Sequence, residues 1–285
     1  MLSGSGCAEP SSTKTVRTSP RGVKQFLRAS IGPVTGLVVA VRYLTILPVP
    51  GPAVPASSGP SLADLGRSAA WFPIVGLGLG LVLALAQWAA SRLFPPLLVG
   101  LLTIAAWKLL TGGLHLDGLA DCLDGLAGRD AAHRLAIMRD SRIGAFAAIG
   151  LVLVLLLDVA AVAEMADDRR WRALVVAPTV ARATPLVLAR LFPPARRDGQ
   201  GASFQASVGR VPTVLAVALA SLVAVVVLGW TGVVAALAGL LAAVLLGWLL
   251  AIRLGGVTGD VLGAAVEVAE LTVLLAGAAW AHGRL

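Results

Sequence analysis

Long apolar runs are the feature that most constrains how this chain can fold. Several stretches approach or exceed the roughly 18–20 residues that a helix needs to cross a bilayer. The sequence is 58% hydrophobic and only 13% charged, whereas a soluble domain is nearer a quarter charged. We therefore predict an all-α, polytopic integral membrane protein rather than a very apolar soluble helical protein. About seven transmembrane helices are expected, at residues 71–91, 96–114, 143–163, 172–191, 211–229, 231–252 and 261–281.

The residues before the first predicted span differ in composition from the rest. Residues 1–30 are polar and basic, which predicts a flexible cytoplasmic tail, and they lack the apolar core of a secretory signal. Residues 31–48 are apolar but include Pro33, Arg42 and Pro48, so we expect a re-entrant or interfacial helix rather than a full span. A Pro/Ser/Gly-rich linker follows at 50–61. Residues 31–285 are expected to form a single helical membrane catalytic domain.

The basic residues are distributed as in a membrane protein. The formal net charge is +8, and most Lys and Arg lie in the tail and in short loops between apolar runs. This pattern indicates membrane topology, not a nucleic-acid partner. With the tail in the cytoplasm, the polar segments 115–142, 191–210 and 253–260 share the cytoplasmic face. If 31–48 crosses the membrane, the tail moves outside and these segments keep their side.

Three aspartates follow the second predicted span, in "GGLHLDGLADCLDG" at residues 112–125. On a helix, Asp117, Asp121 and Asp124 lie at 0°, about 40° and about −20°, so their carboxylates point the same way. Like charges placed together repel unless a cation lies between them, and hard oxygen ligands suit Mg²⁺. We favour a metal site over a solvated acidic helix end. Gly112 and Gly113 would supply a bend before the motif helix.

The spacing of the other residues in this motif does not by itself assign each of them a role. His115 lies about 160° from the aspartate face if the helix already includes it, or reaches the site from the bend. A catalytic or substrate-contact role and a purely structural one are both open for it. Gly118 and Gly125 would leave room for a ligand near the backbone, and Cys122 is expected to be a small filler.

A second polar cluster, Arg139, Asp140, Ser141 and Arg142, stands just before the long apolar run at 143–163. Arginine forks bind phosphate in a bidentate manner, so the two arginines are candidate substrate ligands. Asp140 is a candidate additional metal ligand or an orienter of arginine. Ser141 is expected to cap the following helix. The alternative, an ordinary positive anchor at the membrane surface, explains the arginines but not Asp140.

A glycine-rich loop opens the last predicted span. Such a loop can cradle a phosphate through backbone N–H groups, although alone it is a weak signal. Its candidate substrate-binding residues are Gly255, Gly256, Thr258, Gly259 and Asp260. Within the spans, Glu267 and Glu270 are functional candidates because acids are costly there, and Asp158 is expected to be a buried, hydrogen-bonded group.

Together, these segments place carboxylates, arginines and a glycine-rich loop on one membrane face. That set suits phosphoryl transfer on a phosphate or diphosphate substrate.

The same motifs resemble those of a known family, the cobalamin synthases or adenosylcobinamide-GDP ribazoletransferases. The similarity is carried by "GGLHLDGLADCLDG", by "IMRDSRIGAF" at 137–146 and by "RLGGVTGDVLGA" at 253–264. "YLTILPVP" at 43–50 and "WFPIVGLGLG" at 71–80 also resemble that family, and "RRDGQGASF" at 196–204 does so more weakly.

The resemblance implies a multi-pass enzyme of the bacterial plasma (inner) membrane, with its active-site loops facing the cytoplasm. It would join adenosylcobinamide-GDP to α-ribazole, or to its 5′-phosphate, with release of GMP and use of Mg²⁺. Asp117, Asp121, Asp124 and Asp140 would hold the metal, and one of the carboxylates or His115 would accept a proton. A homo-oligomer or a complex with other cobalamin-pathway enzymes is compatible with this.

Two other functions fit parts of the pattern. A CDP-alcohol phosphotransferase also carries spaced aspartates on membrane helices, but Asp117-Gly118 is not followed here by that family's Ala-Arg pair. A divalent-cation transporter would carry acids near the bilayer middle of several spans, whereas most acids here gather at one interface.

Overall fold

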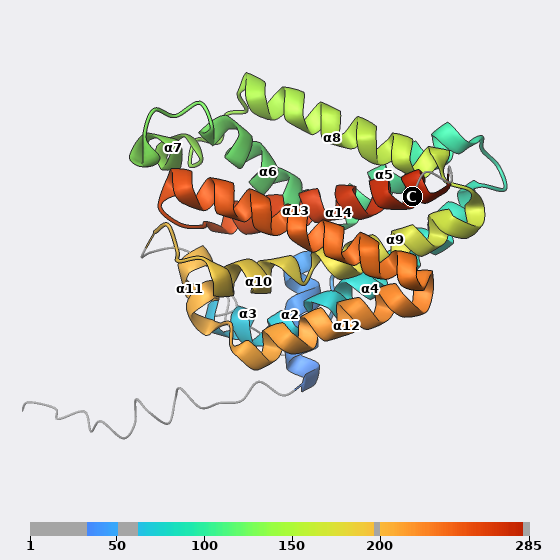
Figure 1. Ribbon diagram of the computed structural model, residues 1–285, viewed down its shortest axis with the longest axis horizontal. Coiled ribbons are helices and arrows are strands. Elements are labelled where there is room, and N and C mark those ends of the chain that lie inside the picture. The colour runs from blue at the N-terminus through green and yellow to red at the C-terminus, as the bar shows by residue number, and fades with distance from the viewer. Residues whose placement is uncertain (1–32, 51–61, 197–199, 282–285) are drawn as a thin grey trace, which may run out of the picture. The chain divides into compact units, whose positions relative to one another are not determined.

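The computed structural model describes residues 33–50, 62–196 and 200–281, and every named element there is helical (Figure 1). The described residues belong to one compact unit that begins at Pro33. Six of their helices are long and apolar enough to cross a membrane, and a bent helix pair raises the number to seven. The prediction of an all-helical protein with about seven spans is confirmed. The tail at 1–30 lies outside the described residues, and so do residues 51–61 of the linker predicted at 50–61.

Five long helices begin and end within two residues of the bounds predicted for their spans. The agreement is expected because a transmembrane helix must be long and apolar, and both properties can be read along the sequence. These helices are α4 (Phe72–Ala90), α8 (Ala145–Glu164), α12 (Arg210–Leu228), α13 (Trp230–Leu254) and α14 (Gly259–Ala281). The short helices α3 (Leu62–Ser68) and η1 (Ala69–Trp71) directly precede α4, which extends that span to Leu65–Ala90.

The apolar helix α2 (Pro33–Leu44) is too short to cross. Its 12 residues extend about 18 Å, against about 30 Å of hydrocarbon. The segment after it is tied to the end of α5 (Pro96–Leu110), where the Ile46 N–H donates to the Leu110 carbonyl at 2.9 Å. The helix therefore fits the expected surface or re-entrant element.

The span at 172–191, which two arginines interrupt, is the most buried of the six. It consists of α9 (Asp167–Ala181) and α10 (Thr184–Leu191), and 83% of its best apolar window lies inside the protein. The same measure is 28% for α8, 28% for α13 and 17% for α12. Those three helices thus present most of their apolar surface outward, as lipid-facing helices do.

Glycines allow α4 to lie directly on α9. A Cβ at Gly80 would come within 2.7 Å of the Leu174 carbonyl oxygen, and one at Gly76 would meet the backbone of Pro178. Small residues four apart are a common means of close helix packing in membranes, where van der Waals contact is a main source of helix association.

A buried ionic cluster joins α5, α8 and α14 to the link between α9 and α10. Lys108 of α5 donates to Glu267 at 2.6 Å and to Glu270 at 3.1 Å, both on α14. Asp158 of α8 lies 3.7 Å from Lys108, and Arg182, between α9 and α10, pairs with Glu270. The expectation that Asp158 is buried is confirmed, and Lys108 is its charged partner, but its Oδ1 has no hydrogen-bond partner within the described residues.

Candidate active site

The site is built on a sharp bend between α5 and α6 (Leu114–Gly125). The two helices meet at 90°, and the bend is made by Gly112 at φ 62° and Gly113 at φ 68°. Residues with a side chain rarely adopt this left-handed conformation. The predicted role of these two glycines is confirmed. The bend turns α6 away from the axis of α5. Asp117, Asp121 and Asp124 all lie on α6, after the bend.

The aspartates occupy one face of α6, as predicted from their spacing. Asp117 is exposed, whereas Asp121 and Asp124 are half-buried. The rise of a helix places Asp117 and Asp124 about 10 Å apart along the axis.

Gly118 brings α6 into contact with the start of α14. A Cβ at this position would come within 2.7 Å of the Asp260 carbonyl oxygen. At Gly125 a Cβ would meet the Cγ of Met138 at 2.8 Å. The expectation that the glycine leaves room for a ligand is wrong for Gly125, whose space Met138 fills, whereas Gly118 does line the cavity described below. The contact at Gly118 also places Asp260 beside the acidic face of α6.

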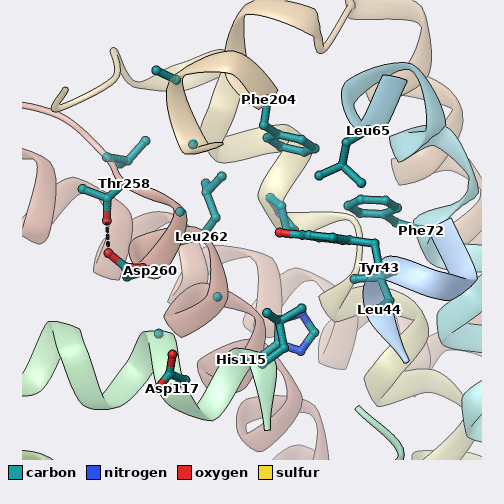
Figure 2. A pocket seen from close by; sticks show the side chains of 18 of the residues that line it. Tyr43, Leu44, Leu65, Phe72, His115, Asp117, Phe204, Thr258, Asp260 and Leu262 are labelled. Carbon is teal, nitrogen blue, oxygen red and sulfur yellow. Dashed lines mark hydrogen bonds between the residues drawn. The ribbon is translucent and has the colours of Figure 1, made fainter. Parts of the chain in front are cut away.

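A cavity of about 300 Å³ opens between α6, α14 and the elements around α2 and α11 (Gln200–Ser207) (Figure 2). Among the predicted site residues, those lining it are His115, Asp117, Thr258, Gly259 and Asp260. It is also lined by residues to which the sequence assigned no chemistry, among them Tyr43, Phe72, Arg196 and Phe204.

His115 lies within α6 and is buried, yet it reaches this cavity. Its Nδ1 has no hydrogen-bond partner within the described part of the chain. A buried polar nitrogen normally has a hydrogen-bond partner. A buried nitrogen without one, at the edge of a cavity, indicates a side chain that can bind a ligand.

Asp124 fixes the N-terminus of α8. Its carboxylate accepts the Gly144 N–H at 2.6 Å and the Ala147 N–H at 2.9 Å. The expectation that Ser141 caps this helix is wrong, because Ser141 is exposed and the cap comes from α6. The carboxylate of Asp124 thus ties the loop 139–144 to the acidic face.

Within that loop, Asp140 and Arg142 hold each other. The Arg142 guanidinium donates to the Asp140 carboxylate at 2.6 Å, and the Arg142 backbone N–H donates to it at 3.1 Å. These bonds lower the pKa of Asp140 to about 2, so it is ionised near neutral pH. Arg139 and Arg142 are both exposed beside the end of α6. Asp140 therefore acts here as an orienter of arginine.

The glycine-rich loop divides into two parts. Gly256 packs closely against residues 193–195, and the Val257 N–H donates to the Pro193 carbonyl at 2.9 Å. Thr258 accepts the Val261 N–H at 3.3 Å and donates to Asp260 at 3.1 Å, which secures the start of α14. The cavity is lined by the second part of the loop, Val257 to Asp260. Gly255 and Gly256, in the first part, do not line it.

The carboxylates fit Mg²⁺ only in part. Within the described residues, no group of three or more His, Cys, Asp or Glu side chains is arranged to hold a metal ion. Mg²⁺ is commonly bound by one or two carboxylates together with substrate phosphates, and Asp117 with Asp121 can supply that minimum. Asp124 and Asp140 are engaged by backbone N–H groups and by Arg142.

Comparison with known proteins identifies the family. The family model described as Cobalamin-5-phosphate synthase matches residues 36–278. This chain belongs to that family.

Relatives named "Adenosylcobinamide-GDP ribazoletransferase" match most of this chain. The protein from Geotalea daltonii is 38% identical over 83% of the chain and 94% of its own length. That from Ectopseudomonas mendocina is 40% identical over 84% and 96%, and that from Roseiflexus is 39% identical over 85% and 89%. No solved structure matches the chain.

The residues that sequence reasoning missed lie within stretches that resemble the cobalamin-5-phosphate synthase family. Tyr43 opens "YLTILPVP", Phe72 is in "WFPIVGLGLG", and Arg196 and Phe204 begin and end "RRDGQGASF". The resemblance therefore covered these four residues, but it indicated no role for them. Their role became visible only because the fold brings these stretches together around one cavity.

Proposed function

We propose that this protein is an adenosylcobinamide-GDP ribazoletransferase that acts late in cobalamin biosynthesis. It transfers the cobinamide-phosphate moiety of adenosylcobinamide-GDP to α-ribazole, or to its 5′-phosphate. The products are adenosylcobalamin, or its 5′-phosphate, and GMP. The observation that carries the proposal is that Asp117 and Asp260, from two separate family motifs, line one cavity, while Asp124 on the same helix as Asp117 holds the loop of Arg139 and Arg142.

The reaction needs one bond to form and one to break at the same phosphorus. The ribose 3′-hydroxyl oxygen of α-ribazole attacks the phosphorus that carries cobinamide, and the phosphorus–oxygen bond to GMP breaks. The hydroxyl proton passes to a base in the cavity, for which His115, Asp117 and Asp260 are the candidates that line it. Arg139 and Arg142 offset the charge that develops on the phosphoryl oxygens.

Asp117 and Asp121 are the residues we assign to Mg²⁺. The ion, when bound, would neutralise charge on the diphosphate and on the leaving GMP. Asp124 contributes by holding the loop of the two arginines against α6, and Asp140 by orienting Arg142.

We place this site on the cytoplasmic face of a bacterial plasma (inner) membrane, following the excess of Lys and Arg in the segments around it. Any homo-oligomer or complex with other cobalamin-pathway enzymes would form around this membrane unit.

The arrangement of the buried acids argues against cation transport. Asp158, Glu267 and Glu270 face Lys108 and Arg182, so these carboxylates already have cationic partners. A transport path would need them available to a passing ion.

The deciding experiment is GMP release by purified protein in lipid vesicles, given adenosylcobinamide-GDP, α-ribazole and Mg²⁺, with and without EDTA. We expect GMP and cobalamin to appear together and both to be lost with EDTA. Folded protein that forms neither product would refute the proposed reaction. Turnover that survives complete chelation would refute only the metal assignment.

A further inference from the structure

One side of the cavity is a wall of parallel aromatic rings. The Tyr43 and Phe72 rings stack with centroids 6.1 Å apart and planes 18° apart. Phe72 and Phe204 stack at 6.0 Å and 12°. Leu44 and Leu65 line the same side, and Figure 2 shows the rings grouped away from Asp117 and Asp260. This half of the cavity is suited to a flat, apolar ring system.

Most of the polar side chains lie on the opposite side. Asp117 comes from α6, Thr258 and Asp260 come from the start of α14, and Arg196 lies beyond α10. The Tyr43 hydroxyl adds a polar group to the aromatic side, and the His115 ring lies beside Tyr43 and Leu44 (Figure 2). Burial and the negative charge of Asp260 raise the pKa of Tyr43, so its hydroxyl stays protonated near neutral pH.

We propose that this cavity is the subsite for α-ribazole, with the benzimidazole base on the aromatic wall and the ribose against the polar side. The inference rests on the proposed transferase function and names which of the two substrates enters here. The base of α-ribazole is a flat dimethylbenzimidazole without N–H donors. Guanine carries several donors and acceptors around its rim, and burying them against Phe72, Phe204 and Leu65 would leave them unpaired.

The size of the cavity supports the same assignment. About 300 Å³ is at the lower end of the volumes of small-molecule pockets. A nucleoside is of this order, whereas the corrin macrocycle is far larger and must remain outside.

The position of the cavity also fits the order of the reacting groups. It opens at Asp117, where the acidic face of α6 begins, and that face runs about 10 Å to Asp124 and the arginine loop. A ribose held at Asp117 would present its hydroxyl to a diphosphate lying along α6. The aromatic wall therefore sets the position of the nucleophile.

The test uses substitutions that remove a ring but keep apolar volume. Binding of α-ribazole alone to the protein in nanodiscs is measured by titration calorimetry, without the nucleotide substrate. Steady-state KM is then measured for each substrate in turn. We expect Phe204→Leu and Tyr43→Leu each to weaken α-ribazole binding about tenfold, because base–aromatic stacking is lost.

Two controls separate this effect from a general loss of stability. Tyr43→Phe keeps the ring and is expected to bind α-ribazole within about twofold of the wild type. Phe94→Leu makes the same substitution in the exposed turn between α4 and α5, outside the cavity, and should leave binding unchanged. Melting temperatures of all variants show whether each is folded.

A complementary arm changes the ligand. The riboside of unmethylated benzimidazole should bind the wild type about tenfold more weakly than α-ribazole, because two buried methyl groups are missing. Phe204→Leu should reduce that difference.

The outcomes are distinct. Weaker α-ribazole binding with an unchanged KM for adenosylcobinamide-GDP supports the subsite. A raised KM for adenosylcobinamide-GDP with unchanged α-ribazole binding would assign the cavity to the nucleotide instead, and no effect on either ligand would also overturn the proposal. If α-ribazole binds as expected but the wild type forms no cobalamin, the transferase function fails and the subsite stands.

Discussion

Asp121 and Asp124 lie three residues apart on the same face of α6, but their surroundings differ. Asp124 accepts two backbone N–H groups at the start of α8, which gives it a structural role. Asp121 is half-buried within electrostatic reach of Asp117, Asp124 and Asp260. Several like charges at short range destabilise one another unless a cation is shared. At the scale of the residue, Asp121 is therefore the sharpest test of the metal assignment.

We expect Asp121→Asn to reduce turnover by about a hundredfold or more, because the substitution removes one of the two carboxylates assigned to Mg²⁺. Its melting temperature should not fall, since the change also removes a source of repulsion. GMP release is the measurement, and Asp168→Asn, an exposed aspartate at the start of α9, is the matched control. Near-normal turnover of Asp121→Asn would show that this carboxylate is not a ligand.

At the scale of the element, α14 connects the site to the interior of the protein. Asp260 stands in its first turn, and Glu267 and Glu270 follow seven and ten residues later. The ionic cluster thus begins roughly 10 Å beyond Asp260 along the same helix. Because Lys108 belongs to α5 and Arg182 precedes α10, the cluster fixes the position of α14 relative to both helices.

Lys108→Met is expected to destabilise the protein by about 3–5 kcal/mol, because it leaves Glu267 and Asp158 buried without their cation. Unfolding by denaturant in mixed micelles measures the loss. The double variant Lys108→Met with Glu267→Gln should recover part of the stability, since it removes one uncompensated charge. A single variant as stable as the wild type would contradict the role assigned to the cluster.

At the scale of the whole molecule, the spans separate two sets of loops. The loop with Ser141 and the turn with Arg92 are separated by one membrane crossing, the bent pair of α5 and α6. The acidic face, the arginine loop and the start of α14 therefore face one side together. The fold does not determine whether this side is the cytoplasmic one. The orientation is set by the excess of Lys and Arg in the loops that stay in the cytoplasm.

The orientation can be tested with single cysteines in a variant that lacks Cys7 and Cys122. A membrane-impermeant thiol reagent applied to intact cells should label Arg92→Cys and leave Ser141→Cys unlabelled. Both positions are exposed, so both should react after the membrane is opened. The reverse labelling pattern would overturn the cytoplasmic placement of the site without affecting the fold.

Local patterns in the sequence determined much of this protein. A bilayer admits a helix only if it is long and apolar, so hydropathy located the spans. Helical periodicity placed Asp117, Asp121 and Asp124 on one face, and two consecutive glycines marked the bend before them. The family was also recognisable, because its motifs are contiguous stretches of chain.

Only the tertiary structure decided which distant residues meet. The contact of Gly118 with Asp260 joins α6 to α14, and Tyr43, Phe72 and Phe204 form one wall although they are far apart in the chain. The same is true of Asp124 as the cap of α8 and of Lys108 as the partner of Glu267. Hydropathy and periodicity describe how a residue relates to its own helix. The partners of a side chain depend on how helices pack, which these local properties do not specify.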